Sequence, residues 1–149
     1  MTLVLCLPLL VQATLMFVDE IHFHRLRGLP RWERIGHPLD TLSVLLCYGV
    51  AVTQPPGKAA LAWYAILAVL SCLLITKDEF VHARRCLPAE QWLHALLFVI
   101  HPIVLGAAAL LWFKAKTALL VGQAALTLVF GGYQLLYWNL PWTRARRAQ

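Results

Sequence analysis

The sequence predicts an all-α integral membrane protein with five transmembrane helices, formed by a single domain over residues 1–149. The chain is 60% hydrophobic and only 13% charged, about half the charged fraction of an ordinary soluble domain. Its apolar residues come in long blocks, which indicates that lipid surrounds the fold. The basic residues flank these blocks, as they do in proteins whose topology is set by charge.

The five expected spans follow the apolar blocks and cover residues 2–24, 38–53, 59–82, 90–113 and 117–138. The first apolar block is long enough to cross a membrane if its helix continues into the polar residues after it. Val11-Gln12-Ala13 has some likeness to a signal-peptide cleavage site. No Lys or Arg precedes the apolar block, however, and we therefore expect a retained helix.

The second span is expected to follow a basic connector over residues 25–38, which Gly28, Pro30 and Gly36 interrupt. Pro38 suits the first position of a helix, and Asp40 would then lie in its opening turn. This predicted span is short for a membrane crossing. The third span follows a tight turn at residues 53–58.

The distribution of basic residues predicts the orientation of the five spans. Only Lys58, Lys114 and Lys116 of the thirteen Lys and Arg lie on one side of the predicted bundle. The positive-inside rule then places the other side in the cytoplasm, with the N-terminus outside and the C-terminus inside. We expect a bacterial inner-membrane protein, with aromatic belts formed by Trp92, Trp138 and Trp142 on the cytoplasmic side and by Trp63 and Trp112 opposite.

A polar signature occurs twice at the end of an apolar block, over residues 19–25 and 78–84. Each copy begins Asp-Glu and has Arg six positions after the Asp. Each is followed by a Glu-x-x-x-His step, at residues 33–37 and 90–94. If this repeat is more than coincidence, the first four spans form two hairpins related by an axis along the membrane normal. They would build a four-helix core, with the fifth helix added.

Acids and histidines at these spacings are typical of metal ligands on helices, because positions three or four apart share a face. Glu79-x-x-His82 has the spacing found in carboxylate-bridged dimetal proteins. The first copy departs from it, because Asp19-x-x-His22 has Asp and Glu20-x-x-x-His24 is one residue longer. The predicted ligands are Glu20, His24, His37, Glu79, His82, Glu90 and His94, with Asp19, His22, Asp40, Asp78 and His101 as second choices.

The number of candidate ligands favours two metal ions over one. A single zinc site needs only three or four ligands, and several carboxylates without nearby lysines would repel one another unless cations neutralised them. Carboxylate and imidazole ligands favour iron, with zinc or manganese as alternatives, over copper(I). The four cysteines form no C-x-x-C pair, and we expect free thiols at Cys6, Cys47, Cys72 and Cys86.

Simpler roles exist for several of these residues. Asp40 would cap a helix, and Glu33 would be a solvated connector residue. His101 would bond a carbonyl freed by Pro102. Asp19 and Asp78 would form interfacial ion pairs with Arg25, Arg84 or Arg85. The arginines of the signature side would set topology or contact anionic lipid.

The end of the last span carries further polar and aromatic residues. Tyr137 and Asn139 would orient metal ligands, or Tyr137 and Trp138 would anchor the helix at the membrane interface. Gly131 and Gly132 would allow close helix contact.

Together these observations predict a membrane-embedded dimetal enzyme that acts on a lipid or another lipophilic small molecule near the cytoplasmic interface. Iron would imply oxygen-dependent oxidation, hydroxylation or desaturation, whereas zinc would imply hydrolysis by a metal-bound hydroxide. The alternatives are a metal-binding or transport protein and a metal-free accessory membrane subunit. The net charge of +6 is explained by topology, so no nucleic-acid partner is expected. Serine-hydrolase, P-loop and dinucleotide-binding motifs are absent from the sequence.

Overall fold

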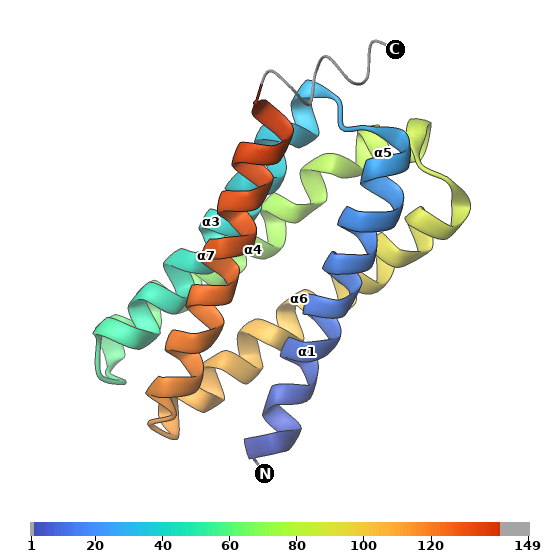
Figure 1. Ribbon diagram of the computed structural model, residues 1–149. Helices are drawn as coiled ribbons and strands as arrows, with labels where there is room; N and C mark the ends of the chain where they lie inside the picture. Colours follow the sequence, from blue (N-terminus) through green and yellow to red (C-terminus); the bar gives the residue numbers. More distant parts are fainter. Residues whose placement is uncertain (1, 141–149) are drawn as a thin grey trace.

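Residues 2–140 are described by a computed structural model, and within that range the regular elements are all helices (Figure 1). They are α1 (Thr2–Val18), η1 (Asp19–His24), α2 (Arg25–Arg27), α3 (Arg31–Thr53), α4 (Lys58–Leu74), η2 (Ile75–Asp78), α5 (Glu79–Arg85), α6 (Pro88–Phe113) and α7 (Thr117–Asn139). The predicted interfacial Trp142 lies outside the described residues.

Five continuous helices of this range are long and apolar enough to cross a membrane, as the sequence predicts. They cover Thr2–Arg27, Arg31–Thr53, Lys58–Arg85, Pro88–Phe113 and Thr117–Asn139. Their outer surfaces carry many large exposed apolar side chains, among them Leu3, Leu70 and Val129. Such surfaces are unfavourable in water and favourable in lipid.

The first and third helices run through the polar signatures, as expected, and end at Arg27 and Arg85, three residues beyond the predicted ends of these spans. α1 passes without a break into η1, a π-helical segment, and then into α2. The helix ends at Gly28, whose φ of 74° is accessible to glycine at little cost. α4 continues in the same way through the 3₁₀ segment η2 into α5.

The second span begins at Arg31, seven residues before the predicted start at Pro38. Pro30 precedes the helix in an extended conformation, and Glu33 lies in the first turn, where an acid is favourable. The expected connector is therefore reduced to residues 28–30. Pro38 is inside the helix and leaves the carbonyl of Arg34 without its usual donor. The side chain of Asn139 donates to that carbonyl at 3.5 Å, which compensates in part for the missing bond.

The helices pack in two groups, in which α3 lies along α4 and α7, and α1 lies along α6. α3 and α7 approach closely at Gly131, where an added Cβ would lie 2.6 Å from Cγ2 of Thr41. No atom lies within 4 Å of a Cβ added at Gly132. The expectation of close helix contact therefore holds for Gly131 and not for Gly132.

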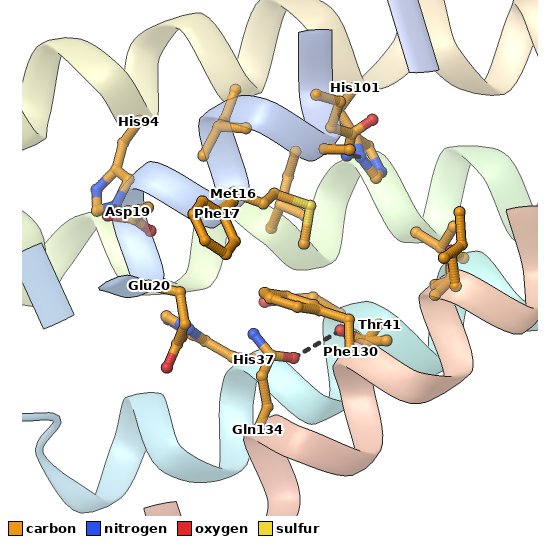
Figure 2. Close-up of a pocket in the computed structure, with 18 of the residues that line it drawn as sticks. Met16, Phe17, Asp19, Glu20, His37, Thr41, His94, His101, Phe130 and Gln134 are labelled. Carbon is orange, nitrogen blue, oxygen red and sulfur yellow. Dashed lines mark hydrogen bonds and ion pairs between the residues drawn. The ribbon is translucent and has the colours of Figure 1, made fainter. Parts of the chain in front are cut away.

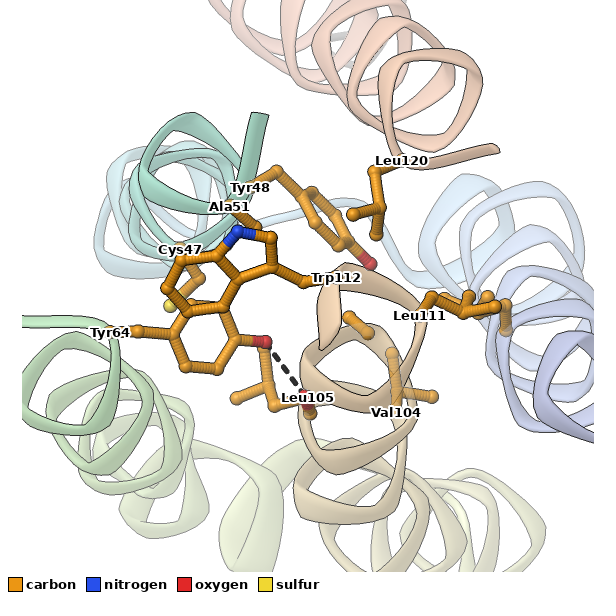
Figure 3. Close-up of a cluster of buried hydrophobic side chains, with 11 residues drawn as sticks. Cys47, Tyr48, Ala51, Tyr64, Val104, Leu105, Leu111, Trp112 and Leu120 are labelled. Carbon is orange, nitrogen blue, oxygen red and sulfur yellow. Dashed lines mark hydrogen bonds between the residues drawn. The ribbon is translucent and has the colours of Figure 1, made fainter. Parts of the chain in front are cut away.

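An apolar core closes the end of the bundle opposite the polar signatures (Figure 3). Tyr48 of α3, Tyr64 of α4 and Trp112 of α6 are buried there with smaller apolar side chains. The Tyr64 hydroxyl donates to the carbonyl of Leu105 at 2.7 Å, and the Trp112 indole donates to that of Gln54 at 2.8 Å. Tyr64 and Trp112 are therefore buried with their polar atoms satisfied.

Candidate metal centre

Four helical segments each contribute a histidine and an acid four residues before it. The pairs are Glu20–His24, Glu33–His37, Asp78–His82 and Glu90–His94, and all eight side chains are buried. A separation of four residues places both members of a pair on one helix face. Helices that are far apart in the sequence therefore deliver the same polar pair to one end of the bundle.

The four imidazoles form a continuous group. The ring centroids of His37 and His24 are 4.8 Å apart, those of His24 and His94 are 6.3 Å apart, and those of His94 and His82 are 4.0 Å apart. Rings this close cannot all carry a positive charge without strong repulsion unless negative groups lie between them.

Two neighbouring acids of η1, Asp19 and Glu20, contact this group directly. Asp19 contacts Nε2 of His24 and Nε2 of His94, each at 3.1 Å. Glu20 contacts Nδ1 of His24 at 3.1 Å and accepts a hydrogen bond from the Trp138 indole at 2.5 Å. The π-helical turn of η1 explains how both acids reach His24, because its wider turn brings residues five apart onto the face of those four apart.

Two buried or half-buried cations offset some of the negative charge. Arg27 donates from Nη1 to Glu33 and from Nη2 to Glu90, both at 2.8 Å. Lys77 lies 2.5 Å from Asp40 and 2.9 Å from Asp78. The carboxylates thus have a nearby lysine, contrary to the sequence-based expectation. Glu33 is fully buried rather than solvated.

The remaining charge is strongly negative when the histidines are neutral. The acids within the site, which exclude the exposed Glu79, are Asp19, Glu20, Glu33, Asp40, Asp78 and Glu90, and the cations beside them are Arg27 and Lys77. Six carboxylates and two cations leave four negative charges, which are costly in a site of low dielectric constant. Two divalent metal ions would neutralise them, as would protonation of the four imidazoles.

Several buried polar atoms of the site also lack a hydrogen-bond partner among the described residues. They are Nε2 of His24, both ring nitrogens of His82, Nδ1 of His94, Oε1 of Glu33 and Oδ1 of Asp78. His24 Nε2 is 3.1 Å from Asp19 and His82 Nε2 is 3.4 Å from Glu33, but neither contact has hydrogen-bond geometry. Buried polar atoms are normally satisfied, and metal coordination would satisfy these.

The ligand atoms can be divided between two ions in two ways. Asp19, His24, Glu90 and His94 form one group whose candidate atoms all lie within 4.8 Å of one another, and His37, Asp78 and His82 form a second. These two groups share no residue, and we call them the oxygen-rich arrangement. The other division combines Glu20, His24 and His37 with His82, Cys86 and His94, and we call it the cysteine arrangement.

The thiol of Cys86 has a different chemistry from the acids. It is partly buried in the short connection between α5 and α6. Burial raises the pKa of this thiol to about 12, and the nearby Arg27 opposes that rise only in part. In the absence of a metal ion, Cys86 therefore remains a neutral thiol and a weak ligand.

The structure brings together most of the predicted ligands, with informative exceptions. Glu79 and His22 are exposed and belong to none of the four candidate groups. Asp40 lies inside α3 and contacts Lys77, so it does not cap a helix. Asp19 and Asp78 contact histidines, and Asp78 also contacts Lys77, in place of the expected arginines. His101 is buried one layer deeper and bonds the side chains of Gln12 and Ser71 rather than a carbonyl.

The sequence-based prediction missed Arg27, Lys77 and Cys86, and it left Glu33 out of the ligand set, favouring a solvated connector residue although Glu33 has the ligand spacing to His37. A usable signal was present, because an acid precedes a histidine by four residues in all four segments. The residues Arg27 and Lys77 carry no such pattern. Their part in the site depends on which helix ends meet, and that is a property of the tertiary fold.

A cavity of about 320 Å³ extends from this centre into the bundle (Figure 2). Asp19, Glu20 and His94 lie at one end, and His101 lies at the other. Apolar side chains, including Met16, Phe17, Phe98 and Phe130, line the space between. Phe17 of α1 and Leu126 of α7 both line the cavity and are exposed, and α1 does not pack along α7. The cavity therefore opens between these two helices.

Comparison of the chain with models of protein families, with curated proteins and with solved structures finds no match.

Proposed function

We propose that this protein is a membrane-embedded metalloenzyme that holds two metal ions and oxidises a lipophilic substrate with molecular oxygen. The observation that carries the proposal is the convergence of four buried acid–histidine pairs, in which four ring nitrogens and two carboxylate oxygens lack a hydrogen-bond partner among the described residues. A site built only for stability would not leave so many buried polar atoms unsatisfied. The proposed orientation places this site at the cytoplasmic side.

The oxygen-rich arrangement supports iron, with manganese as the closest alternative. It supplies three carboxylates and four imidazoles, and carboxylate with imidazole is the ligand set of carboxylate-bridged di-iron proteins. Iron in such a set supplies the oxygen chemistry, and the chain's own residues position the substrate beside it. Hydroxylation or desaturation would each consume oxygen and two electrons, so an external electron donor is required.

The cavity supports a lipophilic substrate. Its walls are mainly apolar, it ends on the candidate metal ligands, and its mouth is flanked by exposed apolar side chains of α1 and α7. A molecule dissolved in the bilayer would enter sideways without passing through water. The polar ligands are confined to one end of the bundle, which favours an enzyme over a pathway that carries ions across the membrane.

The cysteine arrangement favours a second candidate function. It combines the four imidazoles of the same cluster with the Cys86 thiolate and one carboxylate, and the thiolate suits zinc better than iron. Zinc would support hydrolysis by a metal-bound hydroxide. A metal-free network with protonated histidines is the third candidate, and it requires no enzymatic activity.

The test is oxygen consumption by purified protein loaded with ferrous iron, in a mild detergent with a bacterial lipid extract and a chemical electron donor. We expect oxygen uptake that depends on both iron and lipid, and mass spectrometry should find lipids that have gained an oxygen atom or lost two hydrogens. Asp78→Asn should abolish this activity and Glu79→Gln should not. Iron-loaded protein that consumes no oxygen with any lipid fraction would contradict the proposal.

A further inference from the structure

A chain of hydrogen bonds crosses four helices at the deep end of the cavity. Nε2 of Gln12, on α1, lies 3.1 Å from Nδ1 of His101, on α6. Nε2 of His101 lies 2.9 Å from the hydroxyl of Ser71 on α4, which lies 2.7 Å from the hydroxyl of Ser43 on α3. Ser43 also contacts the carbonyl oxygen of Asp40 at 2.7 Å.

The single proton of each hydroxyl fixes the direction of this chain. If Ser43 donates to the Asp40 carbonyl, Ser71 must donate to Ser43, because Ser43 has no second proton. Ser71 then has no proton left for His101, and the imidazole must donate from Nε2. Its Nδ1 is therefore an acceptor, and the amide nitrogen of Gln12 must donate to it.

This direction leaves one group unsatisfied at the cavity. The amide oxygen of Gln12 is buried and has no partner among the described residues. Gln12 and His101 both line the cavity. Every other group in this series of hydrogen bonds has a partner, so the Gln12 oxygen is a free acceptor for a donor on a molecule bound in the cavity.

We propose that Gln12 is the recognition residue of a subsite for the hydroxyl group of a lipophilic alcohol, held in place by His101 and Ser71. The alcohol's hydrocarbon body would lie along Met16, Phe17 and Phe98, toward the candidate metal ligands. His101 and His94 are seven residues apart on α6, which corresponds to about 10 Å along the helix. The metal centre would then act on a carbon remote from the hydroxyl. This last step depends on the proposed function, whereas the hydroxyl subsite does not.

The probe is 1-decanol, compared with 2-decanone and decane, and the readout is thermal unfolding of the purified protein in detergent after incubation with ferrous iron. The alcohol can donate a hydrogen bond, the ketone can only accept one, and decane does neither. We expect a saturable rise in melting temperature with 1-decanol, at a half-saturating concentration about tenfold or more below that of 2-decanone. Gln12→Met should abolish the difference, and Thr14→Val on the same helix should preserve it.

The outcomes separate this proposal from the proposed function. Equal effects of the alcohol and the ketone on the unaltered protein would overturn the subsite, whether or not Gln12→Met folds. A preference for the alcohol that survives in Gln12→Met would also overturn it. A preference that Gln12→Met removes would support the subsite even in protein that binds no metal, and in that case only the proposed enzymatic function would fail.

Discussion

Asp78 and Glu79 are neighbours in the chain but have different surroundings. Asp78 is buried beside His37 and Lys77, whereas Glu79 is exposed. In the sequence, Glu79 and His82 form the Glu-x-x-His pattern that is typical of metal ligands. The acid on the buried helix face of His82, however, is Asp78, which lies four residues before it. Which acid points inward depends on the helix phase, and the 3₁₀ segment η2 shifts that phase where the two acids occur.

Asp78→Asn is expected to remove about one metal ion per chain, because an amide is a weak ligand and carries no charge to offset the ion. Glu79→Gln changes the adjacent residue by the same chemistry and should leave metal content unchanged. Elemental analysis of the two purified variants checks this contrast. Equal metal loss in both would show that the buried face has been assigned to the wrong acid.

Cys86→Ser distinguishes the two arrangements of ligands. The oxygen-rich arrangement contains no cysteine, so we expect the variant to keep its iron. The matched control is Cys72→Ser, which changes a thiol that belongs to none of the candidate groups. Loss of metal in Cys86→Ser alone would favour the cysteine arrangement and with it a zinc-dependent hydrolase.

At the scale of the helices, the sequence predicts the existence of the five spans better than their ends. The apolar blocks are enough to locate each span. The start of α3 was predicted at Pro38 because proline usually marks a first turn, but the helix begins at Arg31 and tolerates Pro38 in its interior. The donor that contacts the freed carbonyl, Asn139, comes from α7 more than a hundred residues away, so local pattern cannot predict it. The π-helical form of η1 depends on tertiary contacts in the same way.

Gly131→Ala tests the close contact of α3 and α7. Its new methyl group would overlap Thr41, which also donates a hydrogen bond to Gln134 at 2.8 Å. We expect destabilisation of about 1–3 kcal/mol, measured as a lower unfolding midpoint in detergent. Gly132→Ala, where space is open, should be neutral or slightly stabilising because alanine favours the helix. An equal effect of both variants would contradict the assigned packing.

For the whole molecule, the position of charged groups links the fold to its orientation. The polar signatures and most arginines occur at one end of the bundle, and the apolar core closes the other. Sequence composition alone predicts this division. It does not predict the charge balance of the site, because the ion pairs of Arg27 and Lys77 appear only when the helix ends are assembled.

The positive-inside rule predicts that the turn at residues 54–57 lies outside the cytoplasm and residue 87 inside it. To test this, the four native cysteines are replaced by serine or alanine, and a single cysteine is introduced at Gly57 or at Leu87. The two variants should differ in labelling by a membrane-impermeant maleimide. In intact cells, only the cysteine at position 57 should react. Labelling of position 87 alone would reverse the topology and place the site on the outer face.

The most direct measurement is the number of metal ions bound by the unaltered protein, purified in mild detergent without chelator and analysed by mass spectrometry of the elements. Four uncompensated carboxylate charges and the unpartnered imidazole nitrogens predict about two divalent ions per chain, mainly iron. Protein that still contains almost no metal after reconstitution with iron, manganese and zinc would contradict the account, because protonated histidines would then neutralise the site.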